Sequence, residues 1–180
     1  MEPKRVSETR TRMSQVMTPN DANLFGNVFG GSLLAMMDLA AYTAAARFAG
    51  NVCVTASFER VDFHEPIEIG EVVTMDAVVS FVGRTSVEVT IVVTAENVLT
   101  GVTRHTNTAH LVMVAIKDGK PTPVPRLICE TRQDKIRYLE GRLRRELRGA
   151  HNSEFERTYR SFLEASDKRL DELLGQERLT

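Results

Sequence analysis

The chain has 180 residues, of which 42% are apolar, and its formal net charge is -1. This composition is typical of one soluble globular domain with an appendage, and it excludes collagen, extended disorder and an assembly of many domains. The near-neutral charge gives no general attraction to nucleic acid or anionic lipid. The two cysteines lie far apart and match no metal-ligand spacing, which favours a reduced, cytoplasmic protein. The polar N-terminus lacks a secretory signal and no run is apolar enough to span a membrane, so we expect no membrane partner.

The segment from Gly26 to Gly50 predicts one long, buried helix. It is rich in alanine and apolar on nearly all sides, so we expect the helix from about Gly31 to Ala49, with Gly50 as its stop signal. A short strand from about Met13 to Met17 is expected before it. After it, apolar and polar residues alternate in four segments, which predict strands near residues 52–58, 73–81, 87–95 and 102–116.

The links between these strands are short and rich in turn residues, such as Gly83 and the pair Asp118-Gly119. Such links are too short for parallel crossovers, so most neighbouring strands are expected to be antiparallel. The sequence therefore predicts an α+β fold in which one long helix lies on one face of a curved antiparallel sheet.

Beyond the prolines at positions 121, 123 and 125 the sequence becomes highly charged. Apolar residues recur there at helical spacing and predict two amphipathic helices with a break near residues 149–152. We therefore divide the chain into a domain over residues 1–126 and a helical extension over residues 127–180. The arginines between positions 132 and 148 suit either a phosphate or nucleic-acid surface or a solvated helix face with acidic partners, and we favour the second. The apolar stripe of the extension predicts contacts within an oligomer.

Asp38 and the glycine pair Gly30-Gly31 are the candidates for chemistry. Asp38 lies in an apolar helix, where an unpaired carboxylate is costly to bury, so it is either an exposed polar residue or part of a functional site. The glycines open the helix, where free N–H groups and the helix dipole attract a carbonyl oxygen, although glycines can also simply form the turn. No Gly-Lys-Ser/Thr sequence follows, which excludes a phosphate-binding P-loop.

The separation of Asp38 from the glycine pair bears on assembly. The eight residues from Gly30 to Asp38 span about 12 Å of helix, whereas an attacking atom lies about 3 Å from the carbon that it attacks. Asp38 is therefore too far from the N-terminus of its own helix to act on a group bound there. If both features serve one reaction, a second copy of the helix has to run antiparallel to the first, as in a two-fold homodimer.

Several motifs in and around this helix match a known family. Residues 19–38 read Pro-x-Asp-Ala-Asn-x-x-Gly-Asn-Val-x-Gly-Gly-x-Leu-Leu-x-x-Met-Asp. The later motifs are Val54-Thr55-Ala56, Phe63-x-x-Pro66-Ile67-x-x-Gly70, Val82-Gly83-Arg84-Thr85-Ser86 and Met113-Val114-Ala115. Together they resemble the hotdog-fold acyl-CoA thioesterases of the cytosolic acyl-CoA hydrolase group, from about residue 13 to residue 125.

The resemblance implies a long central helix wrapped by the sheet, homodimers whose sheets join edge to edge, and hexamers built as trimers of dimers. It also implies hydrolysis of acyl-CoA to free CoA and a carboxylic acid. CoA is then part of the substrate and the product, and no separate cofactor or metal is expected. Two catalytic positions of the family match Asn23 and Asp38, which different subunits supply to one site, in agreement with the distance along the helix.

On this basis Asp38 acts as the general base on water or as a nucleophile, and Asn23 orients the water or the carboxylate. A backbone N–H at Gly30 or Gly31 polarises the thioester carbonyl. The strand turn formed by Arg84, Thr85 and Ser86 is a candidate for binding CoA phosphates, the alternative being a solvated hairpin tip.

Two other functions are compatible with the same fold, a non-catalytic acyl-CoA-binding regulator and a hydroxyacyl-CoA dehydratase. A regulator needs neither Asn23 nor Asp38. A dehydratase is expected to place a histidine beside its acid, whereas no histidine occurs in or near the helix. His64 lies close to Asp62 and Glu65, but no third metal ligand has a suitable spacing, so we interpret it as a turn residue.

Overall fold

The computed structural model describes residues 1–59, 61–63 and 65–176. The chain forms two compact units, Met1–Gly141 and Arg142–Thr180. The predicted division at residue 126 therefore remains a prediction about domain organisation. Among the described residues no helix is long and apolar enough to cross a membrane.

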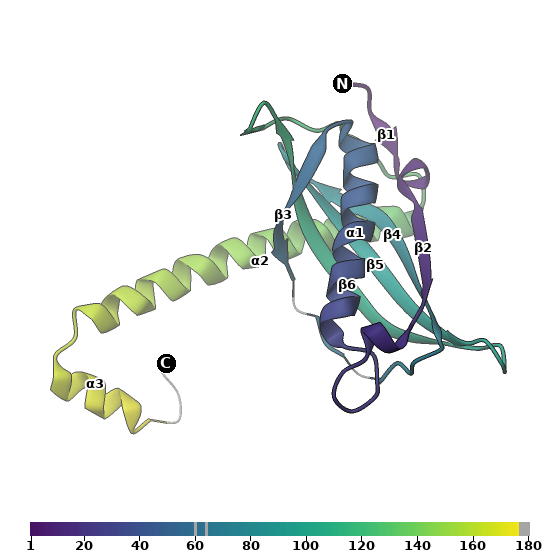
Figure 1. Cartoon of the computed structure of the whole chain (residues 1–180). Helices are drawn as coiled ribbons and strands as arrows, with labels where there is room; N and C mark the ends of the chain where they lie inside the picture. Colours follow the sequence, from purple (N-terminus) through teal and green to yellow (C-terminus); the bar gives the residue numbers. More distant parts are fainter. Residues whose placement is uncertain (60, 64, 177–180) are drawn as a thin grey trace. The chain divides into compact units, whose positions relative to one another are not determined.

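Helix α1 (Gly30–Ala49) forms the centre of the first unit and confirms the predicted helix (Figure 1). It ends where Gly50 adopts a left-handed conformation with φ of 66° and donates its N–H to the carbonyl of Ala46. The side of α1 that faces the sheet is made of apolar and mostly small residues, which let the backbone approach the strands closely. Its buried residues are Leu33, Met36, Met37, Ala40, Ala41, Ala44, Ala45, Phe48 and Ala49.

A six-stranded antiparallel sheet packs against α1. Its strands are β2 (Thr11–Val16), β3 (Val52–Phe58), β4 (Val72–Val82), β5 (Ser86–Asn97), β6 (Val102–Lys117) and β7 (Lys120–Pro121). Five of them follow the order β2-β4-β5-β6-β3, and β7 pairs with the end of β6. The five predicted strands are thus confirmed, with β2 beginning at Thr11. A second small sheet joins β1 (Lys4–Arg5) in parallel to β8 (Leu127–Ile128), and the sequence did not predict this pairing.

The inner face of the sheet supplies the rest of the core. Alternate residues of β4 and β5 point toward α1 and are almost completely inaccessible to solvent, among them Val73, Met75, Val79, Val87, Val89, Ile91 and Val93. The outer face of the sheet therefore carries the residues that lie between these in the sequence.

Helix α2 (Arg132–Leu163) begins on that outer face. Its start is a capping box in which Asp134 accepts from the Thr131 N–H at 2.9 Å and donates its own N–H to the Thr131 hydroxyl at 3.1 Å. The rings of Tyr138 and Phe81 meet edge to face with centroids 5.0 Å apart. A Cβ atom at Gly141 would lie 2.5 Å from Cβ of Phe81, so glycine permits a close contact between helix and sheet.

In the second unit α2 continues unbroken to Leu163, and α3 (Asp167–Leu174) follows. The two predicted helices exist, but the predicted break near residues 149–152 is wrong. A glycine such as Gly149 costs a helix only about 1 kcal/mol relative to alanine, which neighbouring residues that favour the helix can offset. The break lies instead just before α3, where the side chain of Ser166 caps the new helix.

The charged residues of α2 in this unit agree with a solvated helix face. Arg142 donates to Glu146 one turn later at 3.0 Å, and both side chains are largely exposed. Leu143 and Leu147 on the same helix are also more than half exposed. The proposed role of this apolar stripe in an oligomer remains a prediction.

Candidate active site

Asp38 lies half-buried on α1 and faces strand β3 at the edge of the sheet. Its carboxylate oxygen Oδ1 accepts a hydrogen bond from the hydroxyl of Thr55, which also lies 3.5 Å from the sulfur of Met113. Thr55 reaches Asp38 because β3 follows α1 directly and runs beside it. Asp38 is therefore neither a free surface residue nor a deeply buried one.

Thr55 was not predicted as a site residue, although it belongs to one of the family motifs. The face of β3 on which Thr55 lies is the feature that could have identified it. Cys53 is buried, whereas Val52 and Val54 are 59% and 48% exposed, so the odd-numbered residues of β3 point inward. Thr55 itself is exposed at the edge of the sheet, and its hydroxyl binds Asp38 there.

Asn23 lies in a tight loop between Ala22 and Val28, which form an isolated antiparallel bridge. The side-chain oxygen of Asn23 accepts the N–H groups of Phe25 at 2.8 Å and Asn27 at 3.2 Å. This identifies the oxygen atom of the amide and fixes its orientation. No described residue accepts a hydrogen bond from the amide nitrogen, so both of its N–H donors can act on a ligand.

The N-terminus of α1 is open at Gly30 and Gly31. The N-cap residue Phe29 has no side-chain cap, and no described residue accepts a hydrogen bond from the N–H of either glycine. A Cβ atom at Gly30 would lie 3.7 Å from the ring of Phe63, and one at Gly31 would lie 2.2 Å from the ring of Phe29. A side chain at position 30 would only touch the ring of Phe63, whereas one at position 31 would displace the exposed ring of Phe29. Two aromatic rings therefore lie beside the helix N-terminus.

The loop that carries Phe63 is anchored by a partly buried ion pair. Arg104 binds both oxygens of Glu71, at 2.5 and 2.7 Å, and donates to the carbonyl of Pro66 at 2.8 Å. Hydrogen bonding to the guanidinium of Arg104 lowers the pKa of the Glu71 carboxyl below its usual value. Asn107 fixes the other end of the loop through the carbonyl of Asp62 at 2.6 Å.

The turn of Arg84, Thr85 and Ser86 connects β4 to β5. Its backbone is fixed, because the carbonyl of Thr85 accepts from the Ala115 N–H at 2.9 Å and that of Arg84 from the Val124 N–H at 3.0 Å. The side chain of Arg84 is exposed.

This turn lies at the end of the sheet opposite to the glycine pair. Ser86 pairs with Val114, and Val114 pairs with Val54, just after the C-terminal end of α1. The N-terminal end of α1 instead lies beside the loop that precedes β4, where Val28 donates its N–H to the Ile67 carbonyl at 2.8 Å.

The structure thus places the predicted residues at three separate points of one chain, and no contact between described residues joins Asn23 to Asp38. Around Asp38 the surface is apolar, with Leu39 55% and Tyr42 39% exposed. The described residues contain no group of three or more side chains suited to hold a metal ion. His64 lies outside the described residues.

Sequence comparisons place the chain among known proteins. A family model described as the thioesterase superfamily matches residues 25–102. Protein VdlD of Helicobacter pylori is 39% identical over 76% of this chain and 78% of its own length. A Bacillus subtilis protein named uncharacterized acyl-CoA thioester hydrolase YkhA is 36% identical over 71% of this chain and 74% of its own length.

Solved structures agree in fold. A hexameric acyl-CoA thioesterase without ligand superposes with a TM-score of 0.80 and 35% identity, over 84% of this chain and 98% of that one. An acyl-CoA hydrolase of Staphylococcus aureus, solved with butyryl-CoA and CoA, gives a TM-score of 0.79 and 32% identity over 89% and 98% of the two chains. Alanine variants of that enzyme at an aspartate, an asparagine and a threonine also match. With its curled antiparallel sheet, its long central helix and these relatives, the chain belongs to the hotdog-fold acyl-CoA thioesterases.

Proposed function

We propose that this protein hydrolyses the thioester of acyl-CoA to free CoA and a carboxylic acid, with Asp38 as the general base. The observation that carries the proposal is the environment of Asp38. Its carboxylate accepts one hydroxyl donor, Thr55, and has no cationic partner among the described residues. A carboxylate held in place but not neutralised can accept a proton from an attacking water molecule.

Asn23 and the glycine pair supply the remaining groups. The free amide N–H donors of Asn23 hold the water or the carboxylate in position. The free N–H groups of Gly30 or Gly31 bind the thioester oxygen and stabilise the oxyanion that forms when water attacks. A thiolate is a good leaving group, so the reaction needs no strong general acid and no metal. The alternative role of Asp38, as a nucleophile that forms an anhydride, uses the same contacts.

The complete site requires two subunits. About 12 Å of helix separates Gly30 from Asp38 in one chain, and the Arg84 turn lies at the opposite end of the sheet from Gly30. A two-fold axis beside α1 brings the glycine pair of one protomer to Asp38 and Arg84 of the other. The free edge of β3 and the exposed Leu39 and Tyr42 beside Asp38 suit such a homodimer. We extend this to a hexamer, as a trimer of dimers, because solved relatives are hexameric.

The Staphylococcus aureus variants support the choice of residues. The asparagine, aspartate and threonine replaced in them follow one another along that chain with the same intervals as Asn23, Asp38 and Thr55 do here. We assign Thr55 as a positioning residue for Asp38 on the basis of its hydrogen bond.

The fixed turn of Arg84, Thr85 and Ser86 is proposed to bind the phosphates of CoA. A guanidinium and two hydroxyls are suitable donors to phosphate oxygens, and the carbonyls of the turn are already occupied by backbone donors. The substrate, acyl-CoA, brings CoA to the site, and no separate cofactor takes part in the proposed reaction.

A thiol-release assay over acyl-CoA esters from acetyl to palmitoyl tests the function. We expect thiol release by the unaltered protein and a fall in kcat of about 10²- to 10⁴-fold in Asp38→Asn. Asp118→Asn, on an exposed turn, is the matched control and should keep full activity. Binding of acyl-CoA without thiol release would instead favour a regulator. Loss of water from a hydroxyacyl-CoA without thiol release would favour a dehydratase.

A further inference from the structure

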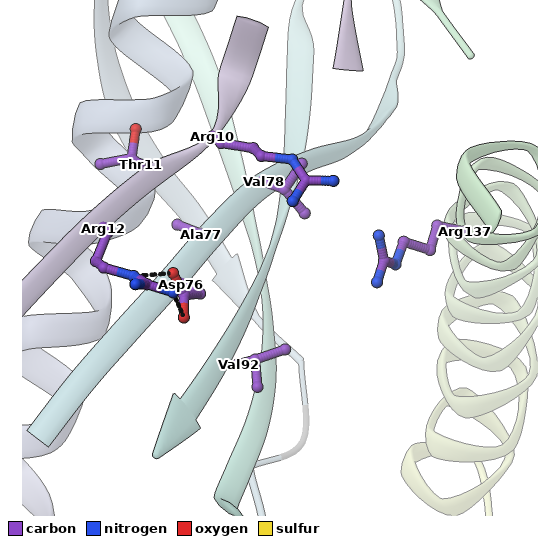
Figure 2. Close-up of a pocket in the computed structure, with 8 residues that line it drawn as sticks. All are labelled: Arg10, Thr11, Arg12, Asp76, Ala77, Val78, Val92 and Arg137. Carbon is purple, nitrogen blue, oxygen red and sulfur yellow. Dashed lines mark hydrogen bonds and ion pairs between the residues drawn. The ribbon is translucent and has the colours of Figure 1, made fainter. Parts of the chain in front are cut away.

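A groove of about 480 Å³ lies on the outer face of the sheet, between β2, β4 and the start of α2 (Figure 2). Three arginines border it, Arg10, Arg12 and Arg137, and the side chains of Val78 and Val92 line its base. Its volume lies within the range of small-molecule sites in proteins, about 300 to 1,000 Å³.

The groove is separate from the proposed active site of the same chain. Thr11 and Ala77 are paired and buried on the side of α1, whereas their neighbours Arg12 and Asp76 are paired on the opposite face. Val92 pairs with Asp76 and so shares that outer face. Asp38 and Thr55 lie on the inner side.

One of the three arginines is already neutralised. Arg12 binds both oxygens of Asp76, at 2.6 and 2.9 Å, and this hydrogen bonding raises the pKa of the guanidinium. Arg12 and Asp76 therefore add no net charge to the groove.

The other two guanidinium groups reach toward each other from opposite sides of the groove (Figure 2). Neither Arg10 nor Arg137 has a hydrogen bond or an ion pair with any described residue. Two acids lie three residues from Arg137 along its helix, Asp134 and Glu140. Asp134 Oδ2 accepts the backbone N–H groups of Glu130 and Thr131 at 3.2 and 2.9 Å. Burial raises the pKa of Asp134, but these hydrogen bonds and the charge of Arg137 lower it overall, so Arg137 acts on Asp134 through its charge without a direct ion pair. Two like charges thus face each other over an aliphatic surface, an arrangement that an anion between them would stabilise.

We infer that this groove binds the phosphate monoester group of a small organic molecule. A phosphate monoester carries a charge of about -1.5 to -2 at neutral pH, which matches two guanidinium groups better than a single carboxylate does. Arginine also suits phosphate because its N–H groups can bind two oxygens at once. Val78 and Val92 offer aliphatic contact to the body of the ligand. CoA carries such a monoester, and so do many unrelated metabolites.

Titration calorimetry with inorganic phosphate tests the site directly, at constant ionic strength and without sulfate. We expect saturable binding, weakened about tenfold or more in each of Arg10→Ala and Arg137→Ala. Arg126→Ala, an exposed arginine outside the groove, is the matched control and should bind like the unaltered protein. Asp76→Asn should act in the opposite direction and tighten binding, because it frees Arg12 and removes a negative charge.

A second titration identifies the source of the phosphate. If the monoester belongs to CoA, Arg10→Ala and Arg137→Ala should weaken the binding of CoA but not that of dephospho-CoA. If the two variants weaken the binding of inorganic phosphate but not the binding of CoA, the groove serves a separate phosphorylated molecule. The inference is overturned if inorganic phosphate does not bind saturably, or if Arg126→Ala weakens binding as much as the groove variants do. These binding measurements do not depend on thioesterase activity.

Discussion

Two carboxylates of the first unit, Glu71 and Asp38, are held in different ways. Glu71 is 4% exposed, and both of its oxygens bind the guanidinium of Arg104. Asp38 is half-buried and accepts a single hydroxyl, from Thr55. A carboxylate neutralised by a cation holds a loop in place but is a poor base. A carboxylate held by a neutral hydroxyl keeps its orientation and remains free to accept a proton. The environment of Glu71 therefore suits a structural role, and that of Asp38 suits the proposed role of a base.

The proposal that two subunits share one site can be tested by mixing two inactive variants. Asn23→Ala and Asp38→Asn should each lower kcat by about 10²- to 10⁴-fold. After unfolding and refolding together, half of the dimers are mixed, and each contains one intact site. Activity should then recover to about one quarter of that of the unaltered protein. Mixtures that stay inactive, or an isolated protomer with full activity, would contradict the shared site.

The hydroxyl that orients Asp38 can be removed with little change in shape by Thr55→Val. We expect kcat to fall about tenfold to a hundredfold, the usual value of a hydrogen bond to a charged group. KM should change little, since the substituted side chain acts through Asp38. Thr55→Ser restores a hydroxyl and should recover most of the activity in the same thiol-release assay. Equal activity of the valine and serine variants would remove Thr55 from the mechanism.

Glu71→Gln removes the charge that pairs with Arg104. Because the pair is largely buried but the Arg104 side chain is still 29% exposed, we expect a loss of about 1–3 kcal/mol in the free energy of unfolding. Urea unfolding at neutral pH measures this loss. Glu96→Gln, at an exposed position, is the matched control.

The same pair predicts a pH dependence. The pKa of Glu71 is lowered in the folded protein, so its stabilising effect is complete above the unfolded-state pKa of about 4.3 and is lost as the pH falls through the lower, folded-state pKa. The difference in stability between the unaltered protein and Glu71→Gln should therefore shrink below about pH 4. A difference that grows on acidification would contradict the assignment.

The smallest effect is expected at the helix N-terminus, in Gly31→Ala. The added methyl group displaces the half-exposed ring of Phe29 and narrows access to the free N–H donors without removing them. We expect kcat/KM to fall by about tenfold or less, with little change in melting temperature, because alanine favours the helix by about 0.5–1 kcal/mol. Gly149→Ala, a helical position with open space around it, should leave kcat/KM unchanged.

The main elements of the first unit could be predicted because their patterns are long. The alanine-rich segment ending at Gly50 has the length and composition of a buried helix, and four segments alternate with the period of a strand. The sequence also contains Asn23, Asp38 and the glycine pair in a recognisable order. The α+β arrangement of these elements follows from the shortness of their links.

Contacts between distant elements could not be predicted in the same way. Alternation in β3 predicted a strand but not that Val52 and Val54 point outward while Thr55 points inward to Asp38. The parallel pairing of β1 with β8 involves only two residues of each strand, too few for a periodic signal. The continuity of α2 past Gly149 depends on the balance of helix propensity over many residues, which one glycine does not decide.

The close contact at Gly141 determines where this protein can be shortened. A deletion from residue 127 onward would remove β8, uncover the ring of Phe81 and leave β1 unpaired, so its effects would mix loss of the extension with damage to the sheet. A chain ending just after Gly141 keeps these contacts, and comparing its assembly size with that of the full chain isolates what the remaining helices contribute.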